Sequence, residues 1–177
     1  KVVFHGSLNR WVSGKDLILY LIGMIGFDGA LYRALEFTGK TVALLTMADR
    51  LTIANMAIEG GAKNGIFAPD ETTRAYVEKR AKRAYKFYAS DTDAAYCQVI
   101  DIDVSKIEPQ VAFPHLPSNT RGISQAGDVK IDQVVIGSCT NGRIEDMRVA
   151  AAVLKGRQVA PYVRLIVIPA TQEIYRQ

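Results

Sequence analysis

The sequence predicts an α/β fold with a parallel sheet, and three observations support this class. Residues 132–136 and 163–168 are short apolar runs, separated by a helical stretch with a turn signal at each end. A strand, a helix and a strand at this spacing form a βαβ unit, whose two strands are parallel. Further apolar runs at 64–68 and 99–104 alternate with helical stretches. Apolar residues make up 49% of the 177 residues, which is enough for a buried core.

Helix-capping residues, glycines and prolines indicate where the elements in the first part of the chain begin and end. Ser13 followed by Asp16 is typical of a helix N-terminus, and the pair Gly60-Gly61 is typical of a helix end. Pro69 and Asp70 end an apolar run and open a basic stretch. The first helix is apolar nearly all round, which predicts a buried position. The expected elements are a helix at 14–25, a strand at 30–37, a helix at 47–58 and a strand at 64–68.

The net charge of +4 lies in one stretch of the chain. Residues 63–86 hold seven basic and three acidic side chains, and the remaining chain is neutral. Apolar residues at positions 77, 81, 84, 85 and 88 predict one face of an amphipathic helix, with the basic side chains opposite. Such a helix is typical of a solvated surface, and a docking surface for an acidic partner is the alternative.

A stretch rich in proline and glycine indicates a division of the chain into two domains. Residues 109–127 contain three prolines, two glycines, two serines and an asparagine, which is typical of a connection between elements or domains. We therefore expect a first α/β domain at 1–110, a connecting segment at 111–130, and the start of a second α/β domain at 131–177. His115 is expected to be a histidine of the connecting loop.

A tight loop at 137–142 lies inside the predicted βαβ unit. It follows the strand at 132–136 and precedes a helix at 143–155, at the position where open α/β sheets bind ligands. Thr140 or Asn141 is expected to cap this helix. Unpaired N–H groups and the helix dipole near Cys139 favour its thiolate. Cys139 therefore suits the role of a metal ligand or a nucleophile.

The residues alone leave the role of Cys139 open. Neither His5 nor His115 has a spacing that pairs it with Cys139 as a general base. Cys97 has no metal-ligand spacing to Cys139, and a disulfide between them is not expected without a secretory signal. A structural cysteine is the alternative. Arg143 either aids carboxylate binding or is an exposed residue of the first helical turn.

Composition excludes several classes of protein. Two cysteines cannot form a disulfide framework, and the apolar content excludes a disordered chain. The most apolar run, 17–27, is shorter than the roughly 20 residues of a membrane-spanning helix. The first residues do not resemble a secretory signal, so we expect a cytoplasmic location without a membrane partner. The chain opens in an apolar run and closes in a helical stretch, so we expect a piece of a longer protein.

Four stretches resemble blocks of one family, in the same order along the chain. The stretch 136–146 reads IGSCTNGRIED and resembles the first iron–sulfur signature of the aconitase superfamily. The stretch 51–62 reads LTIANMAIEGGA and resembles a second block, while 12–19 and 67–71 resemble further blocks. The resemblance covers nearly the whole chain. The Gly-Arg ending of the first block is similar to the isopropylmalate isomerase and homoaconitase branch.

The resemblance implies three-layer α/β/α aconitase-type iron–sulfur domains, incomplete in this chain, and the chemistry of a hydro-lyase. The family isomerises hydroxy acids by dehydration and rehydration at a [4Fe–4S] cluster, which acts as a Lewis acid. For this branch the implied reaction converts 2-isopropylmalate to 3-isopropylmalate in leucine biosynthesis. Homoaconitase and 2,3-dimethylmalate dehydratase large subunits are the alternatives, because they share these motifs.

The resemblance also implies roles for individual residues. Cys139 matches the first of three cysteine ligands of the cluster, and Asn141 stands beside it as a second cofactor-binding residue. Glu59 matches an active-site glutamate near the departing hydroxyl, and Asn55 matches an asparagine near the cluster. Residues 55 and 59 are four apart on the expected helix, so both side chains should project from one face.

Parts of the family pattern are missing from this sequence. The other two cluster ligands form a Cys-x-x-Cys pair in the family, and no such pair occurs here. We therefore expect the central piece of a large subunit that is inactive by itself and holds no stable cluster. Its expected partners are the small subunit of the same dehydratase and a small hydroxy-acid substrate, and nucleic acid is not expected. A cluster-free RNA-binding or regulatory module, and a thiol enzyme using Cys139, are the alternatives.

Overall fold

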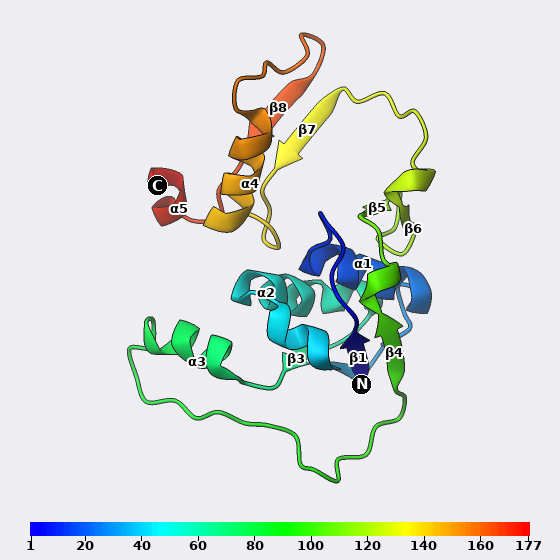
Figure 1. Ribbon diagram of the computed structural model, residues 1–177, viewed down its shortest axis with the longest axis vertical. Helices are drawn as coiled ribbons and strands as arrows, with labels where there is room; N and C mark the ends of the chain where they lie inside the picture. The colour runs from blue at the N-terminus through cyan, green and yellow to red at the C-terminus, as the bar shows by residue number, and fades with distance from the viewer. The chain divides into compact units, whose positions relative to one another are not determined.

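Four short strands from the first part of the chain form one parallel sheet (Figure 1). The computed structural model describes residues 1–177, the whole sequence. Each strand pairs in parallel with its neighbours, in the order β3-β2-β1-β4. This arrangement confirms the predicted α/β class. The strands are β1 (Val2–His5), β2 (Ala34–Thr38), β3 (Asn64–Phe67) and β4 (Ile100–Asp103).

Two helices bury one face of this sheet. Helix α1 (Gly14–Ile25) packs against α2 (Met47–Met56), and α2 also contacts β3. Phe4 and Phe37, on neighbouring strands, are buried with stacked rings, and they share one core with the apolar side chains of α1. Burial of this apolar face supplies the main driving force for the unit to fold. The predicted burial of the first helix is confirmed.

Both helices begin at a capping box. Asp16 accepts hydrogen bonds from the backbone N–H of Ser13 at 2.7 Å and from its hydroxyl at 2.8 Å. Thr46 and Asp49 form the equivalent box at the start of α2. The N-terminus predicted from Ser13 is therefore confirmed. At the other end, α2 stops at Met56, two residues before the predicted end, and continues as a 3₁₀ turn, η2 (Ala57–Gly60).

A hairpin lies within the stretch that the sequence predicts as a connection. Strand β5 (Gln110–Ala112) pairs antiparallel with β6 (Thr120–Gly122), and both strands contact α1. The short 3₁₀ segments η3 (Val104–Lys106) and η4 (Ile123–Gln125) flank this hairpin. By its contacts the chain forms two units, Lys1–Ala126 and Gly127–Gln177, and the hairpin belongs to the first. The domain boundaries expected from the sequence stay a prediction.

Helix α3 (Glu71–Glu78) corrects the prediction for the basic stretch. The helix ends at Glu78, so the amphipathic helix expected to reach position 88 is wrong. None of its residues is buried, and a short helix that buries so little gains too little from packing to extend. Local ring contacts occur in this stretch instead of the expected apolar face. Tyr85 packs edge-on against Phe87, and Arg80 lies over the ring of Tyr76. Figure 1 shows an irregular segment that runs from α3 back to β4.

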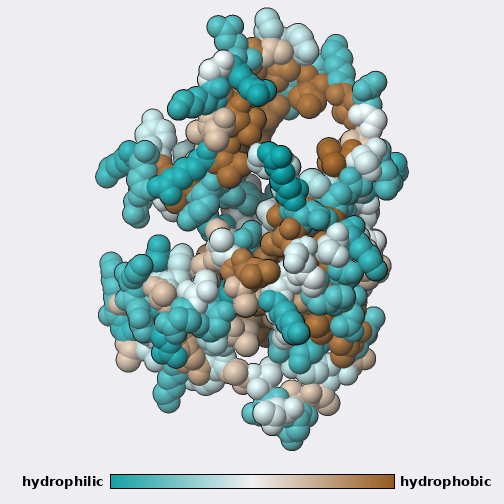
Figure 2. Space-filling view, in the orientation of Figure 1, coloured by the Kyte–Doolittle hydropathy of each residue, from teal (hydrophilic) through white to brown (hydrophobic).

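The second unit contains the predicted βαβ arrangement. Strand β7 (Gln133–Ile136) pairs in parallel with β8 (Arg164–Val167), and α4 (Ile144–Leu154) connects them. A short helix, α5 (Gln172–Arg176), follows. The two strands and the connecting helix confirm the prediction, with ends shifted by one residue. Figure 2 shows hydrophobic surface, in brown, over the β7–β8 pair. Along the whole chain, no helix combines the length and apolar character that crossing a membrane requires.

Candidate functional site

The loop 137–142 begins at a glycine that no other residue can replace without strain. Gly137 has a φ of +112°, a backbone conformation that favours glycine. A Cβ atom at this position would overlap the carbonyl oxygen of Ile168, just past the end of β8. The loop therefore leaves β7 in close contact with the neighbouring strand. Ala170 donates a backbone hydrogen bond to the carbonyl of Gly142 at 2.9 Å, which attaches the far side of the loop as well.

Hydrogen bonds close the loop around Cys139. The backbone N–H of Ser138 donates to the carbonyl of Asn141 at 2.8 Å, and the N–H of Asn141 donates to the Ser138 hydroxyl at 3.0 Å. The hydroxyls of Ser138 and Thr140, which flank the cysteine, are hydrogen-bonded at 2.9 Å. Thr140 is buried, whereas Cys139 is exposed and free of any disulfide. The loop thus presents the thiol to solvent from a hydrogen-bonded turn.

Helix α4 begins later than the sequence predicts. Its N-cap is Arg143, so the expectation that Thr140 or Asn141 caps the helix is wrong. Asp146, three residues after Arg143, accepts a hydrogen bond from the Arg143 backbone N–H at 3.0 Å. This spacing between the N-cap and an acidic residue is the signal that identifies Asp146, which the sequence analysis did not assign to the site. Cys139 lies four residues before the N-cap, outside the first turn of the helix.

Arg143 and Asp146 hold the loop from the helix side. The Arg143 guanidinium donates through Nη1 to the carbonyl of Thr140. The second oxygen of Asp146, Oδ1, accepts a hydrogen bond from Nδ2 of Asn141 at 3.0 Å. Asn141 is thus tied to the start of the helix through its side chain. Arg143 is half-buried, and its side chain makes a contact within its own loop, so it is not simply an exposed residue of the first helical turn.

Asn55 and Glu59 lie in successive turns of the first unit. Asn55 belongs to the last turn of α2, and Glu59 belongs to the 3₁₀ turn η2, which Gly61 ends with a φ of +85°. Both side chains are exposed. A 3₁₀ turn has three residues rather than 3.6, so the α-helical argument for one shared face does not apply strictly. The joint role of these two residues stays a prediction.

An ion pair between a buried arginine and an exposed aspartate fixes the helix that carries Asn55. Arg50 of α2 is 1% exposed and donates to both carboxylate oxygens of Asp70, each at 2.6 Å. It also donates to the carbonyl of Val42 at 2.9 Å. The hydrogen bonds from Arg50 lower the pKa of Asp70 to about 2. The pair therefore ties α2 to the start of α3, where Asp70 is the N-cap.

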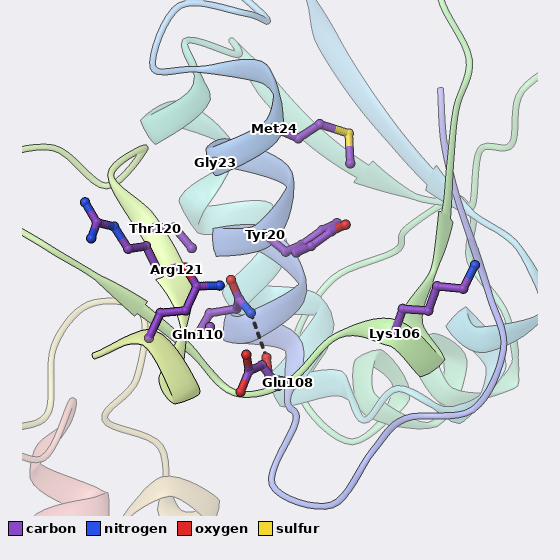
Figure 3. A pocket seen from close by; sticks show the side chains of 10 residues that line it. Tyr20, Gly23, Met24, Lys106, Glu108, Gln110, Thr120 and Arg121 are labelled. Atoms are coloured by element: carbon purple, nitrogen blue, oxygen red, sulfur yellow. Dashed lines mark hydrogen bonds between the residues drawn. The ribbon is translucent and has the colours of Figure 1, made fainter. Parts of the chain in front are cut away.

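Two cavities of the first unit lie apart from the predicted site residues. One cavity of about 400 Å³ lies between α1 and the β5–β6 hairpin (Figure 3). Tyr20, Glu108 and Gln110 line it, and the Gln110 amide donates to the carbonyl of Glu108 at 2.8 Å. A second cavity, of about 430 Å³, is lined partly by Cys97. Neither cavity includes Asn55 or Glu59 in its wall.

The donor set of the loop fits one thiolate ligand of a metal cluster. Cys139 is exposed, and the hydroxyls of Ser138 and Thr140 beside it hydrogen-bond to each other. No three side chains of histidine, cysteine, aspartate or glutamate group together in this chain as a metal site. Cys139 thus provides one thiol, and a cluster with three cysteine ligands needs donors from outside this loop.

The fold is that of an α/β protein, and its exposed thiol lies just beyond the carboxyl end of a parallel strand, the position where such sheets bind ligands. Comparison with known proteins agrees with this class. The model of the family described as Aconitase family (aconitate hydratase) matches residues 1–128 and 123–177. The chain belongs to the aconitase family.

Three similar proteins carry one name, 3-isopropylmalate dehydratase large subunit. The protein of Syntrophus aciditrophicus (strain SB) is 77% identical over 176 residues, which is 99% of this chain. The protein of Caldanaerobacter subterraneus subsp. tengcongensis is 65% identical over 99% of this chain. That of Hydrogenobaculum sp. (strain Y04AAS1) is 60% identical over 100% of it. The chain spans 42% of the length of each relative.

Proposed function

We propose that this chain is part of the large subunit of a hydro-lyase that interconverts 2-isopropylmalate and 3-isopropylmalate by dehydration and rehydration. The observation that carries the proposal is the Cys139 loop, presented within a chain that is 77% identical to a 3-isopropylmalate dehydratase large subunit. The chain spans only 42% of that relative, so the complete protein performs the reaction and the isolated piece is expected to be inactive.

In this proposal Cys139 holds one iron of a [4Fe–4S] cluster through its thiolate. When bound, such a cluster supplies a Lewis acid for a substrate hydroxyl and carboxylate. Asn141 supports the ligand, because it closes the loop through its backbone and reaches Asp146 through its side chain. The remaining thiolate ligands would come from parts of the complete subunit outside this chain.

The proposal assigns to the first unit the proton transfer at the departing hydroxyl. Glu59 gives a proton to this hydroxyl, which leaves as water, and takes the proton back from water in the hydration step. Asn55 donates hydrogen bonds from its amide beside it, and the base that removes the C–H proton would come from outside this chain. Their support is exposure and position. Asn55 reaches solvent from the last turn of α2, which the Arg50–Asp70 ion pair holds in place, and Glu59 reaches it from the adjoining turn η2. The proposal includes a small subunit as partner, a small hydroxy acid as substrate and a cytoplasmic location.

The test uses the complete large subunit, expressed with its small subunit and reconstituted anaerobically with iron and sulfide. Dehydration of isopropylmalate gives the alkene isopropylmaleate. The rate of its hydration is measured from the loss of the ultraviolet absorbance of its double bond. We expect Cys139→Ser to lose the cluster and the activity. Glu59→Gln should keep the cluster and lower turnover by about 100-fold or more, as expected for loss of a general acid–base group.

Two matched variants serve as controls in this test. Cys97→Ser removes the other cysteine of the chain, and Glu78→Gln removes an exposed carboxylate of α3. Both should retain the cluster and wild-type turnover. A Cys139→Ser complex that hydrates isopropylmaleate as fast as the wild-type complex would overturn the proposal. So would a complex that binds a cluster but accepts only a different hydroxy acid.

A further inference from the structure

We propose that Arg143 and Asp146 form a clamp that positions the Cys139 thiol for cluster ligation. This inference rests on the proposed function and goes beyond it, because it assigns positioning roles to two side chains next to the ligand loop. Arg143 contributes both its backbone N–H and its guanidinium, and Asp146 contributes both carboxylate oxygens. We use the word clamp for these two residues and their four groups.

The clamp holds the loop at two points that follow the cysteine directly. The guanidinium of Arg143 binds the carbonyl of Thr140, the residue next to Cys139. Asp146 binds the Asn141 side chain through Oδ1 and the Arg143 backbone N–H through Oδ2, each at 3.0 Å. One carboxylate therefore connects the end of the loop to the start of α4. Charged partners make such hydrogen bonds stronger than neutral ones.

The rest of the loop cannot absorb a displacement at these points. Ser138 is joined to both Thr140 and Asn141 by hydrogen bonds, so Cys139 lies at the tip of a closed turn. Gly137 lies against the carbonyl of Ile168, and Gly142 is hydrogen-bonded to Ala170. A shift of Thr140 is therefore transmitted to the neighbouring cysteine rather than spread along a flexible chain.

The contacts of Arg143 favour a positioning role over the two earlier alternatives. Nη1 of its guanidinium is already used by the carbonyl of Thr140, within its own loop, rather than directed to a substrate. A residue of a solvated surface would be exposed, whereas Arg143 is half-buried. Groups that orient a metal ligand from behind change metal affinity by about 10- to 100-fold when removed. We expect the clamp to act in this range.

The test compares Arg143→Met with Arg148→Met in the complete subunit. Arg148 is an exposed arginine of the same helix, so its replacement is the matched control. After anaerobic reconstitution, the rate of cluster loss to a chelator is measured, together with the electron paramagnetic resonance spectrum. We expect Arg143→Met to lose the cluster at least about tenfold faster with an altered spectrum. Arg143→Lys keeps a donor and should recover part of the effect, and Arg148→Met should match wild type.

A second measurement separates positioning from general destabilisation. Amide hydrogen exchange of the cluster-free subunit should accelerate in residues 138–142 of Arg143→Met and stay unchanged in β7 and β8. If Arg143→Met does not fold, Asp146→Asn takes its place, because it weakens the contacts with Asn141 and with the Arg143 backbone. A melting temperature that falls together with a uniform rise in exchange would overturn the clamp and indicate a structural role only.

Two further outcomes would also overturn the inference. A wild-type rate of cluster loss in Arg143→Met shows that the ligand does not need the clamp. A raised KM with an intact cluster shows that Arg143 binds substrate instead. If the wild-type subunit binds no cluster, the proposed function fails, and the exchange data alone decide the clamp: faster exchange confined to 138–142 supports it, and unchanged exchange overturns it.

Discussion

At the scale of single residues, charge is placed where its cost is offset by defined partners. Arg50 is almost fully buried, and it would be strongly destabilising without Asp70, because an unpaired charge in the interior is expensive. Asp70 is 39% exposed, so water shares its stabilisation. The same pattern occurs at Asp146, whose two oxygens are both used by neighbouring donors. In each case one carboxylate joins two segments of chain.

The Arg50–Asp70 pair predicts how stability changes with pH. The pKa of Asp70 falls from 3.8 to about 2 on folding, mainly through hydrogen bonds from Arg50. The stabilisation is therefore complete above about pH 4 and is lost as the pH falls toward about 2. Denaturant unfolding followed by circular dichroism at pH 7, 4, 3 and 2 should show this loss in the wild-type chain.

The variant Arg50→Met isolates this effect from that of other carboxylates. It should cost about 1–3 kcal/mol at pH 7, because the charge-assisted hydrogen bonds are lost while the exposed Asp70 returns to water. Its unfolding free energy should then fall less than that of wild type between pH 4 and 2. Parallel curves for the two proteins would contradict the prediction, since they would place the pH dependence elsewhere.

At the scale of elements, helix ends connect parts of the chain that are distant in sequence. Asp16 caps α1 through Ser13 and also accepts a hydrogen bond from the backbone N–H of Gln110 at 2.8 Å. Asp49 likewise caps α2 and accepts from the N–H of Gly14 at 2.8 Å. The cap of each helix is therefore part of the tertiary structure, and it fixes a neighbouring element.

This double role predicts unequal effects of two variants at the same cap. Asp16→Ala should lower the unfolding free energy of the first unit by about 2–4 kcal/mol, because it removes the cap and leaves the Gln110 N–H without its acceptor. Ser13→Ala should cost about 1 kcal/mol, since only the cap is weakened. Hydrogen exchange should show loss of protection at β5 in Asp16→Ala alone. Equal losses in both variants would refute the double role.

At the scale of the whole molecule, the two units differ in how much apolar surface they bury. Every buried hydrophobic side chain lies between Val2 and Ile107, in the first unit. In the second unit some valines of β7 and α4 are about half exposed, with Val135 at 50% and Val149 at 56%. Hydrophobic burial dominates folding stability, so the second unit is the weaker of the two.

We therefore predict that the second unit opens first. In hydrogen exchange under native conditions, amides of β7, β8 and α4 should exchange at least about tenfold faster than those of β1 and α1. Denaturant should lower the protection of the first unit only at a higher concentration than the one that lowers the protection of the second unit. A single opening free energy shared by all these elements would argue against separate stabilities. The amides of residues 138–142 should exchange at rates similar to those of the second unit.

Much of the fold was predictable because it depends on local signals. The spacing of apolar runs indicated the parallel β7–α4–β8 unit, and Ser13 with Asp16 located the start of α1. The motif around Cys139 indicated the family, which the match over the whole chain shows. The site roles of Asn55, Glu59, Asn141 and Cys139 stay predictions, since they concern a ligand rather than the folded chain alone.

The sequence by itself determined the α/β class, the loop that presents Cys139 and the family, because these follow from periodicity, turn residues and a contiguous motif. Only the tertiary structure decided the length of α3, the docking of the 110–122 hairpin on α1 and the contact of the Arg143 guanidinium with the carbonyl of Thr140. The physical reason is the same for all three. Each depends on whether a partner lies within reach: packing for α3, α1 for the hairpin, and the carbonyl of Thr140 for Arg143.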